Sequence, residues 1–379
     1  MSRIVVSGMV AADQNQGGAA WAVLQYVAGL RRLGHDVLLL EQMPPEAVEP
    51  AGSALADSGN ASYFSRAAAQ AGVASGAALV VGETGEAHGS SFDELVEWTA
   101  SADLLLNVSG ILSDPRLFEQ IRVRAYLDLD PAFNQLWQEQ GIDMHFAGHT
   151  HFVTVGQAIG TPACPVPTLG LDWIPTVPPV VLDRWPVADG PGDAWTTIGN
   201  WRGYGSVEQD GVHYGQKAHS MREYVDLPGK ARARFRLALG IHPGETPDLE
   251  ALDKHGWPLA DPLEVAGTPD AYQEFIRGSR GELGVAKSGY VLSRCGWFSD
   301  RSACYLASGR PVVAQETGWS AFIPAGEGLL AFSDTDSAAA AIESVESRYE
   351  EHARAARALA EEHLDSDRVL DRLLDRLLG

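Results

Sequence analysis

Residues 299–319 read SDRSACYLASGRPVVAQETGW and bring together groups that suit an anionic ligand. A polar start leads into a helical pattern of small residues, and a Gly-Arg-Pro sequence ends that pattern before a buried strand. A helix N-terminus attracts phosphate through its unpaired N–H groups and the positive end of its dipole. Arg301 and Ser302 lie in the predicted first turn, where a cation opposes the dipole unless it meets an anion. We therefore predict that Arg301 binds phosphate bidentately, with Ser302 beside it; the alternative is that Arg301 pairs with Asp300 or with solvent.

A turn that carries a carboxylate follows the strand of the same segment. Glu316, Thr317 and Gly318 come at the carboxyl end of this strand, where ligands bind in open α/β sheets. The Glu316 carboxylate could accept hydrogen bonds from the hydroxyl groups of a ligand, with the next two backbone amides close by. The alternative is an ordinary capping turn.

Composition limits the partners that we expect. The chain has 50 acidic and 28 basic residues, and its net charge is −22. Nucleic-acid-binding proteins normally carry excess positive charge, so we expect no nucleic-acid partner, although a small anion could bind in a locally positive pocket. The three cysteines are scattered, the N-terminus lacks a long apolar region, and no run of eighteen apolar residues occurs. We therefore expect a cytoplasmic protein without disulfides or a membrane span.

Apolar, strand-like runs alternate with helical patterns in both halves of the chain, which predicts parallel sheets covered by helices on both faces. Eight of the 21 prolines fall between residues 161 and 192, where we place the connection between two domains. We predict two tandem, doubly wound, Rossmann-like α/β domains that face each other across a cleft. They comprise residues 1–175 and 194–364, joined by a proline-rich linker at 176–193. Residues 365–379 form a last helix with a leucine-rich face that needs a partner surface.

Within this architecture, LASGRPVVAQETGW resembles the donor-binding segment of GT-B glycosyltransferases, in which a helix ends in small-x-Gly-x-Pro before a buried strand and a polar turn. PAGEGLLAF, at residues 324–332, resembles the G-x-G-x-L segment that follows it in this family. Near the N-terminus, a Gly-Gly pair, a helix and LGHDV are similar to the family's first βαβ unit. The resemblance implies a transferase that uses a nucleoside diphosphate sugar, with the donor on the second domain and the acceptor on the first. It also implies that the last helix crosses back onto the first domain.

Two glutamates of the family are missing from this sequence. Many retaining members carry them eight positions apart in the donor-site helix, and those positions fall on Gly296 and Cys304. Neither residue can accept hydrogen bonds from a sugar or a ribose as a carboxylate does. We therefore expect inversion at the sugar and do not expect the family's usual carboxylate contact with the ribose.

The resemblance places further residues at the donor. Asn200 and Trp201 end the first strand of the second domain and should approach the cleft. Lys217 stands where family members often carry a lysine, and would be a second phosphate cation or, alternatively, a solvated lysine. Residues 316–318 would contact the sugar hydroxyls. The positive end of the helix and Arg301, with Lys217 assisting, would stabilise the leaving phosphate in place of a divalent ion. We therefore expect a metal-independent reaction with no cofactor beyond the nucleoside diphosphate sugar.

An inverting transferase needs a base that removes the acceptor proton. Asp13 lies in a glycine-rich loop after the first strand, next to Gly17 and Gly18 on the acceptor side, and has the best position for this role. Further candidates are Asp128 and Asp130, at the end of the strand RAYLDLDP, and His149 and His151, in the segment GHTHF. Each of these residues could instead be a cap or turn residue. The DLD sequence could suggest the metal-binding DxD motif of single-domain transferases, but those enzymes do not have two tandem sheets. The spacing of His145, His149 and His151 fits no standard zinc pattern, so we expect no metal site.

Two other functions stay open on the same fold. A nucleotide-sugar epimerase would share the donor site and would isomerise its donor without any acceptor. A non-catalytic nucleotide-binding protein would explain the missing glutamates. A nicotinamide dehydrogenase is disfavoured, because no G-x-G-x-x-G joins a strand to a helix. The loops at residues 51–76 and 133–149 should choose the acceptor, which we expect to be a small molecule, and a homodimer stays open.

Overall fold

The first half of the chain builds an eight-stranded sheet in the computed structural model, which describes all 379 residues. The strand order is β4-β3-β2-β1-β5-β6-β7-β8, and every neighbouring pair is parallel except β3 and β4. The strands are β1 (Arg3–Ser7), β2 (Asp36–Met43), β3 (Ala77–Val81), β4 (Ala87–His88), β5 (Leu104–Val108), β6 (Val123–Asp128), β7 (His151–Thr154) and β8 (Trp173–Pro175). The helices are α1 (Gly17–Arg32), η1 (Pro45–Ala47), η2 (Leu55–Asp57), α2 (Gly59–Gln70), α3 (Phe92–Ala100), α4 (Pro115–Phe118) and α5 (Phe133–Glu139). Every residue of β5, LLLNV, is buried, as expected for a parallel sheet that is covered on both faces.

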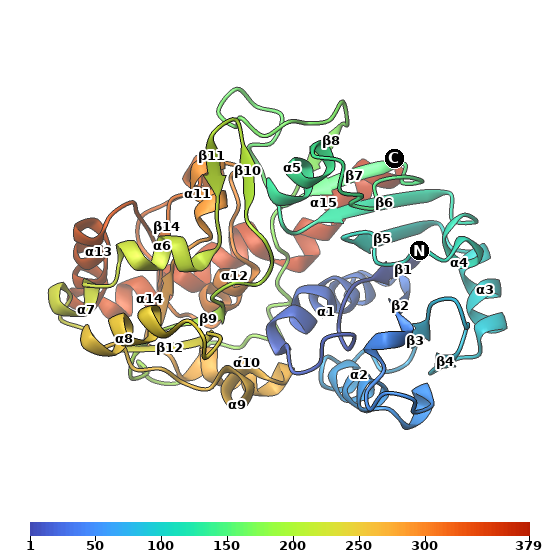
Figure 1. Ribbon diagram of the computed structural model, residues 1–379, viewed down its shortest axis with the longest axis horizontal. Coiled ribbons are helices and arrows are strands. Elements are labelled where there is room, and N and C mark those ends of the chain that lie inside the picture. The colour runs from blue at the N-terminus through green and yellow to red at the C-terminus, as the bar shows by residue number, and fades with distance from the viewer.

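A separate five-stranded parallel sheet forms the second domain, which lies on the left of the first in Figure 1. Its order is β12-β9-β13-β14-β15. The strands are β9 (Trp195–Asn200), β12 (Phe235–Gly240), β13 (Gly281–Gly284), β14 (Val312–Gln315) and β15 (Leu329–Phe332), with an antiparallel pair β10 (Val207–Gln209) and β11 (Val212–Tyr214). The helices are α6 (Lys217–Glu223), α7 (Leu227–Lys230), α8 (Thr246–Lys254), α9 (Pro262–Ala266), α10 (Pro269–Gly278), α11 (Ser288–Ser293), α12 (Asp300–Ala307), η3 (Trp319–Ala321), α13 (Thr335–Ser347) and α14 (Tyr349–Leu359). No helix in this fold combines the length and the apolar character that a membrane crossing needs.

The last helix, α15 (Ser366–Leu378), follows a π-helical turn, η4 (Ala360–Leu364), and packs on α1 of the first domain. Its leucine-rich face is buried. Gly29 of α1 lies so close that a Cβ at this position would come within 2.5 Å of Leu370 Cδ1. The apolar face that the sequence shows is thus covered by the other domain, and the chain crosses between the domains a second time.

The N-terminal end of α1 packs against the second domain. Trp21 Nε1 donates a hydrogen bond to the carbonyl of Pro269 at 2.9 Å, and the Tyr63 hydroxyl donates one to the carbonyl of Gly267 at 3.0 Å. A Cβ at Gly17 would lie only 2.3 Å from a backbone carbonyl oxygen of the loop between α9 and α10. Glycine at this position therefore lets the backbones of the two domains touch.

Candidate functional site

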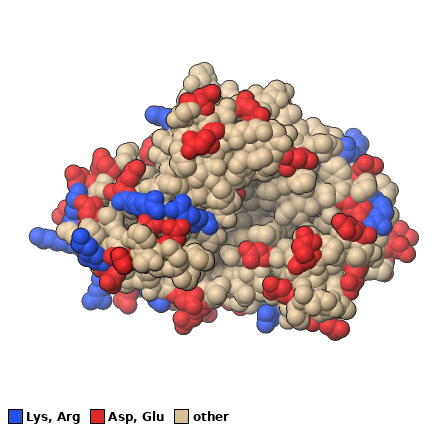
Figure 2. Space-filling model, in the orientation of Figure 1, with Lys and Arg blue, Asp and Glu red and all other residues tan.

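A cleft with a volume of about 940 Å³ runs between the two domains. Figure 2 shows it as the hollow near the centre of the molecule. The loops after β1 and β5 and the end of β6 form one wall, with Asp13, Ser109 and Asp130 among its residues. The other wall comes from the end of β9, the first turns of α6 and α12, and the loop after β13. The cleft therefore lies at the carboxyl ends of strands from both sheets, where open α/β folds bind ligands.

Two basic side chains, one buried and one partly buried, converge at Gly199 on the wall of the second domain. A Cβ at Gly199 would lie 3.3 Å from Lys217 Cε and 4.0 Å from Arg301 Nη1, so both side chains converge on one point of the cleft. Lys217 is 6% exposed, and its Nζ donates a hydrogen bond to the carbonyl of Val285. Arg301 Nη1 donates one to the carbonyl of Ile198 at 2.9 Å. Because residue 199 has no side chain, the two basic side chains border the cleft at this point without a covering group.

A buried carboxylate on β13 orients Arg301. Glu282 has no exposed surface, and its Oε1 accepts a hydrogen bond from Arg301 Nε at 2.5 Å. Its Oε2 has no hydrogen-bond partner. Burial, followed by the neighbouring charge of Arg301, lowers the pKa of Lys217 well below its usual value, although Glu282 opposes this shift. Together, Lys217, Arg301 and Glu282 carry a net positive charge whenever Lys217 is protonated, and such a charge suits a diphosphate.

Helix α12 begins at the cleft, as the sequence predicts. Ser299, Asp300 and Arg301 all line the cleft at its first turn. Ser299 is the N-cap residue, and its hydroxyl is buried without a hydrogen-bond partner. Ser302, for which we predicted a phosphate contact, is 2% exposed and lies outside the cleft lining. The helical turn directs Ser302 into the core, so the hydroxyl available at this end of the helix is that of Ser299.

Asp13 lies on the opposite wall, in the loop after β1. It is exposed and lines the cleft. Partial burial, together with the nearby Glu49 carboxylate, raises the pKa of Asp13, which makes it a better proton acceptor than an ordinary aspartate. Gly17 and Gly18 line the cleft beside it, and a Cβ at Gly18 would lie 2.9 Å from the ring of Tyr272. Both glycines allow close contact with the second domain, a reason that the sequence did not reveal.

Asp130 bridges the two domains. Lys287 Nζ donates a hydrogen bond to Asp130 Oδ1 at 2.8 Å, and the hydroxyls of Tyr204 and Tyr290 donate to the same oxygen. Burial raises the pKa of Asp130, but Lys287 and the two tyrosines outweigh this effect and hold it below its usual range. A carboxylate with a lowered pKa is a weak base. The catalytic role predicted for Asp130 is therefore replaced by a role in holding the domains together.

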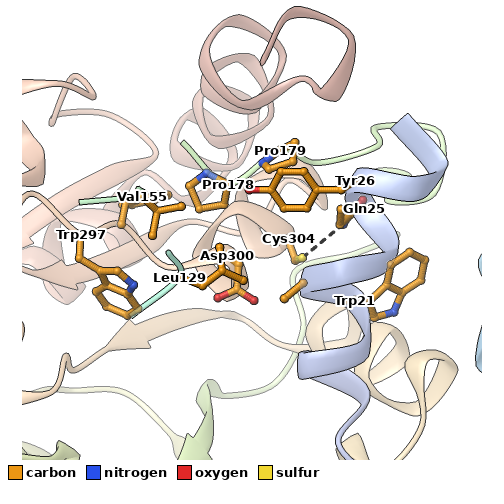
Figure 3. A pocket seen from close by; sticks show the side chains of 12 residues that line it. Trp21, Gln25, Tyr26, Leu129, Val155, Pro178, Pro179, Trp297, Asp300 and Cys304 are labelled. Carbon is orange, nitrogen blue, oxygen red and sulfur yellow. Dashed lines mark hydrogen bonds between the residues drawn. The ribbon is translucent and has the colours of Figure 1, made fainter. Parts of the chain in front are cut away.

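A small cavity of about 30 Å³ adjoins the cleft where α1 meets α12 (Figure 3). The Asp300 carboxylate lines this cavity, and burial raises its pKa. Cys304 also lines it, and Gln25 Nε2 of α1 donates a long hydrogen bond to Cys304 Sγ at 3.8 Å. A Cβ at Gly296 would lie 2.8 Å from the backbone nitrogen of Ala158. Position 304 thus faces α1, position 296 has no room for a side chain, and neither places a carboxylate at the donor.

Several solved structures with the same architecture are glycosyltransferases. HepE from Anabaena in complex with UDP-glucose matches with a TM-score of 0.60 at 12% identity, covering 100% of this chain and 99% of HepE. Alpha-glucosyltransferase (AGT) in complex with UDP matches with a TM-score of 0.60 at 12% identity, covering 100% of both chains. AviGT4, a glycosyltransferase involved in avilamycin A biosynthesis, matches with a TM-score of 0.51 at 14% identity, covering 100% of this chain and 97% of AviGT4.

The chain has the GT-B fold. The predicted pair of doubly wound domains is therefore confirmed. No protein-family model and no curated protein matches the sequence.

The GT-B comparisons overturn our expectation about partners. AGT in complex with UDP and a 13-mer DNA matches this chain with a TM-score of 0.57 at 12% identity, covering 100% of this chain and 99% of AGT. This fold therefore accommodates a nucleic acid, and a net charge of −22 is no ground for excluding one or for restricting the acceptor to small molecules. The expectation failed because binding depends on the local charge of the contact surface, and net charge does not describe that.

The two residues predicted at the end of β9 point in different directions. Asn200 is exposed and lines the cleft, as expected. Trp201 is 2% exposed, and its Nε1 donates a hydrogen bond to Asp248 at 2.8 Å in the core of the second domain. Successive side chains of an extended segment face opposite sides. Trp201 is thus a core residue, contrary to the prediction of a donor contact.

The turn after β14 lies outside the cleft lining, contrary to the predicted contact with the donor sugar. Thr317 Oγ1 donates a hydrogen bond to the carbonyl of Trp297 at 2.5 Å, and Glu316 accepts one from the backbone of Gly318 at 2.5 Å. Gly318 has a φ of +95°, and a Cβ there would come within 2.8 Å of the Arg294 carbonyl oxygen. The three residues support the segment that leads into α12, and Glu316 lies outside the residues that line the cleft.

Two other base candidates are also structural. His149 packs against the rings of Phe118 and Tyr126, with centroids 5.0 and 5.3 Å away, and burial lowers its pKa to about 4. Asp128 has no exposed surface and accepts hydrogen bonds from three side chains of α5 and β7. Neither residue lines the cleft. Among the predicted base candidates, Asp13 is the carboxylate that faces the cleft without an ion-pair partner.

Sequence reasoning missed several polar residues of the site. Glu282 could have been recognised from the sequence, because it is the one charged residue within the buried strand β13. No local pattern marks Lys287, Tyr204 and Tyr290, since their importance comes from their hydrogen bonds to Asp130 of the other domain. Contacts between domains do not follow from local patterns in the chain.

Proposed function

We propose that the protein transfers a sugar from a nucleoside diphosphate sugar, bound by the second domain, to an acceptor at the first-domain wall of the cleft. The observation that carries this proposal is the convergence of Lys217 and Arg301 at Gly199, in a cleft between two GT-B domains. Transfer releases a nucleoside diphosphate, so negative charge grows on the phosphate oxygens in the transition state. Basic side chains that are already positioned in a partly dry site stabilise this growing charge, which is the kind of interaction that accelerates a reaction.

We also propose that transfer is independent of a divalent metal ion. Lys217, Arg301 and the N-terminal end of α12 supply at the leaving phosphate the positive charge that a metal ion supplies in other transferases. Turnover in EDTA should then equal turnover in magnesium. Loss of activity in EDTA and its recovery with magnesium would overturn this part of the proposal.

We propose further that the sugar is transferred with inversion and that Asp13 is the base. Support comes from the lack of a carboxylate at positions 296 and 304 and from the exposed Asp13 on the opposite wall of the cleft. Asp13 would take the acceptor hydroxyl proton as the sugar carbon forms its new bond. The anomeric configuration of the product, measured by NMR, tests this assignment, and a retained configuration would contradict it.

A thermal-shift panel tests the donor site. It would contain nucleoside diphosphates, their glucose conjugates and the corresponding nucleosides with uracil, thymine, guanine and adenine bases. A ligand at 100 times its dissociation constant stabilises the fold by about 2.7 kcal/mol, and the nucleosides should stabilise it less because they lack the phosphates. If no nucleotide raises the melting temperature, the proposed function is wrong. Isomerisation of the bound sugar without any acceptor would indicate an epimerase instead.

A further inference from the structure

Lys217 is buried among charges that come from three different segments. Facing it are Arg301 of α12, Glu282 of β13 and Lys287 of the loop after β13. Lys287 is itself paired with Asp130, so a protonated Lys217 makes cations outnumber carboxylates in this group. Its Nζ has one acceptor within the protein, the carbonyl of Val285. An ammonium group in such surroundings has lost most of its hydration and has gained a single neutral hydrogen bond in return.

Glu282 offsets this excess of positive charge only in part. Its Oε1 is engaged by Arg301 Nε at 2.5 Å, and its Oε2 makes no hydrogen bond. A guanidinium does not lose its proton in a folded protein, so Lys217 is the cation of this pair that can become neutral. Burial and Arg301 lower the pKa of Lys217, while Glu282 is the neighbour that raises it.

We propose that Glu282 is a positioning residue that sets the charge of Lys217, and that Lys217 takes up a proton when the diphosphate binds. The inference rests on the proposed function, because the ligand is the diphosphate of the sugar donor. The two phosphate charges enter between Lys217 and Arg301 and reverse the local excess of positive charge. The neutral amine then takes one proton from solvent and becomes the ammonium group that binds the phosphate oxygens. Each binding event consumes up to one proton.

Such coupling makes donor affinity depend on pH. Between the pKa of Lys217 in the free protein and its higher pKa in the complex, affinity should fall by up to about tenfold for each unit of rising pH. A nucleoside without phosphates brings no charge to Lys217. Its binding should therefore neither take up protons nor change with pH.

Isothermal titration calorimetry with UDP-glucose tests the proposal. The phosphates of this ligand do not titrate near neutral pH, so any proton taken up is bound by the protein. Titrations between about pH 6 and pH 8.5, in buffers with different heats of ionisation, give the number of protons bound with the ligand. If TDP-, GDP- or ADP-glucose binds more tightly, it replaces UDP-glucose, because the cations contact the diphosphate and not the base. We expect proton uptake and an affinity that falls as pH rises, with neither effect for uridine.

Two variants separate charge from structure. Glu282→Gln keeps an acceptor for Arg301 but removes the negative charge, so the fall in affinity should move to lower pH by roughly one unit or more. Lys217→Arg keeps its proton at every pH and should bind the donor with little pH dependence. A purely structural role for Glu282 would lower the melting temperature of Glu282→Gln but would leave the midpoint of the pH dependence in place.

The outcomes are distinguishable. If none of the four sugar nucleotides binds, both the proposed function and this inference fail. If the donor binds to the natural protein without proton uptake and equally well at every pH, the inference fails and the proposed function stands. An unchanged pH midpoint in Glu282→Gln overturns the role of Glu282. Should that variant fail to fold, the wild-type proton count and the Lys217→Arg variant still decide whether Lys217 is the group that titrates.

Discussion

Arg301→Ala should weaken the binding of nucleoside diphosphates by about 10- to 150-fold and leave nucleoside binding nearly unchanged. A charge-assisted contact in a partly buried site contributes about 1.5–3 kcal/mol, and each 1.4 kcal/mol is about tenfold in affinity. The Arg301 side chain is 12% exposed, so solvent and salt screen its charge only weakly. The upper part of the range applies if both Nη atoms of the guanidinium reach the phosphate.

The same substitution should also destabilise the fold. Glu282 would lose the one hydrogen bond that its buried carboxylate makes, and breaking a buried ion pair costs about 3–5 kcal/mol. The double variant Arg301→Ala with Glu282→Gln removes this stranded charge. Its melting temperature should recover much of the loss, while its affinity for diphosphates stays low.

Calorimetric titration with UDP and with uridine, well below the melting temperature of each variant, separates the two effects. Arg280→Ala is the matched control, because Arg280 pairs with Glu346 at 2.7 Å and lies outside the cleft lining. It should lose stability without losing affinity for the diphosphate. If Arg301→Ala loses UDP and uridine affinity equally, the arginine supports the fold and does not contact the phosphates.

Three other substitutions test separate parts of the structure. Asp13→Asn should lower turnover by about 100-fold or more with donor affinity nearly intact, because it removes a proton acceptor; full activity would exclude Asp13 as the base. Asp130→Asn weakens the bridge to Lys287, so small-angle X-ray scattering should show a larger radius of gyration, and an unchanged radius would show that other contacts keep the cleft closed. Glu41 lies beneath the loop that carries Asp13, and burial raises its pKa from 4.5 to about 7. Because Glu41 ionises at a higher pH in the folded state than in the unfolded state, the free energy of unfolding should fall by roughly 3 kcal/mol as the pH rises from 4.5 to about 7. Glu41→Gln should remove this pH dependence. An equal pH dependence in the variant would contradict the assignment to Glu41.

Local chemistry made part of this site predictable from the sequence. Buried apolar runs between helices gave the parallel sheets, since only strands covered on both faces have that pattern. The sequence drew attention to Arg301, because a cation in the first turn of a helix opposes the helix dipole and needs an anion nearby. In the structure Glu282 is such an anion and Arg301 lines the cleft, while its contact with phosphate stays a prediction. The prediction for Lys217 was based on the resemblance to GT-B enzymes, and the structure places this residue next to Arg301 at Gly199.

Several residues have other positions in the structure than the sequence predicted, because local patterns carry no information on packing between distant segments. The turn at Glu316 has the composition of a ligand-binding loop, but the positive φ of Gly318 packs it against the backbone before α12. Trp201 and its neighbour Asn200 lie at the end of the same strand, but Asn200 faces the cleft and Trp201 faces the core. Asp130 looked like a catalytic carboxylate until the other domain supplied its lysine and tyrosines. Each of these outcomes depends on packing between segments that are distant in the chain.

The central claim is that Lys217 and Arg301 bind the diphosphate of a sugar nucleotide at Gly199. A crystal structure of the protein with a nucleoside diphosphate tests it most directly. We predict phosphate oxygens within hydrogen-bond distance of Lys217 Nζ and of the Arg301 guanidinium, with the Glu282 contact to Arg301 preserved. A diphosphate bound elsewhere in the cleft, with Lys217 still donating to the carbonyl of Val285 and no phosphate near Gly199, would contradict the claim.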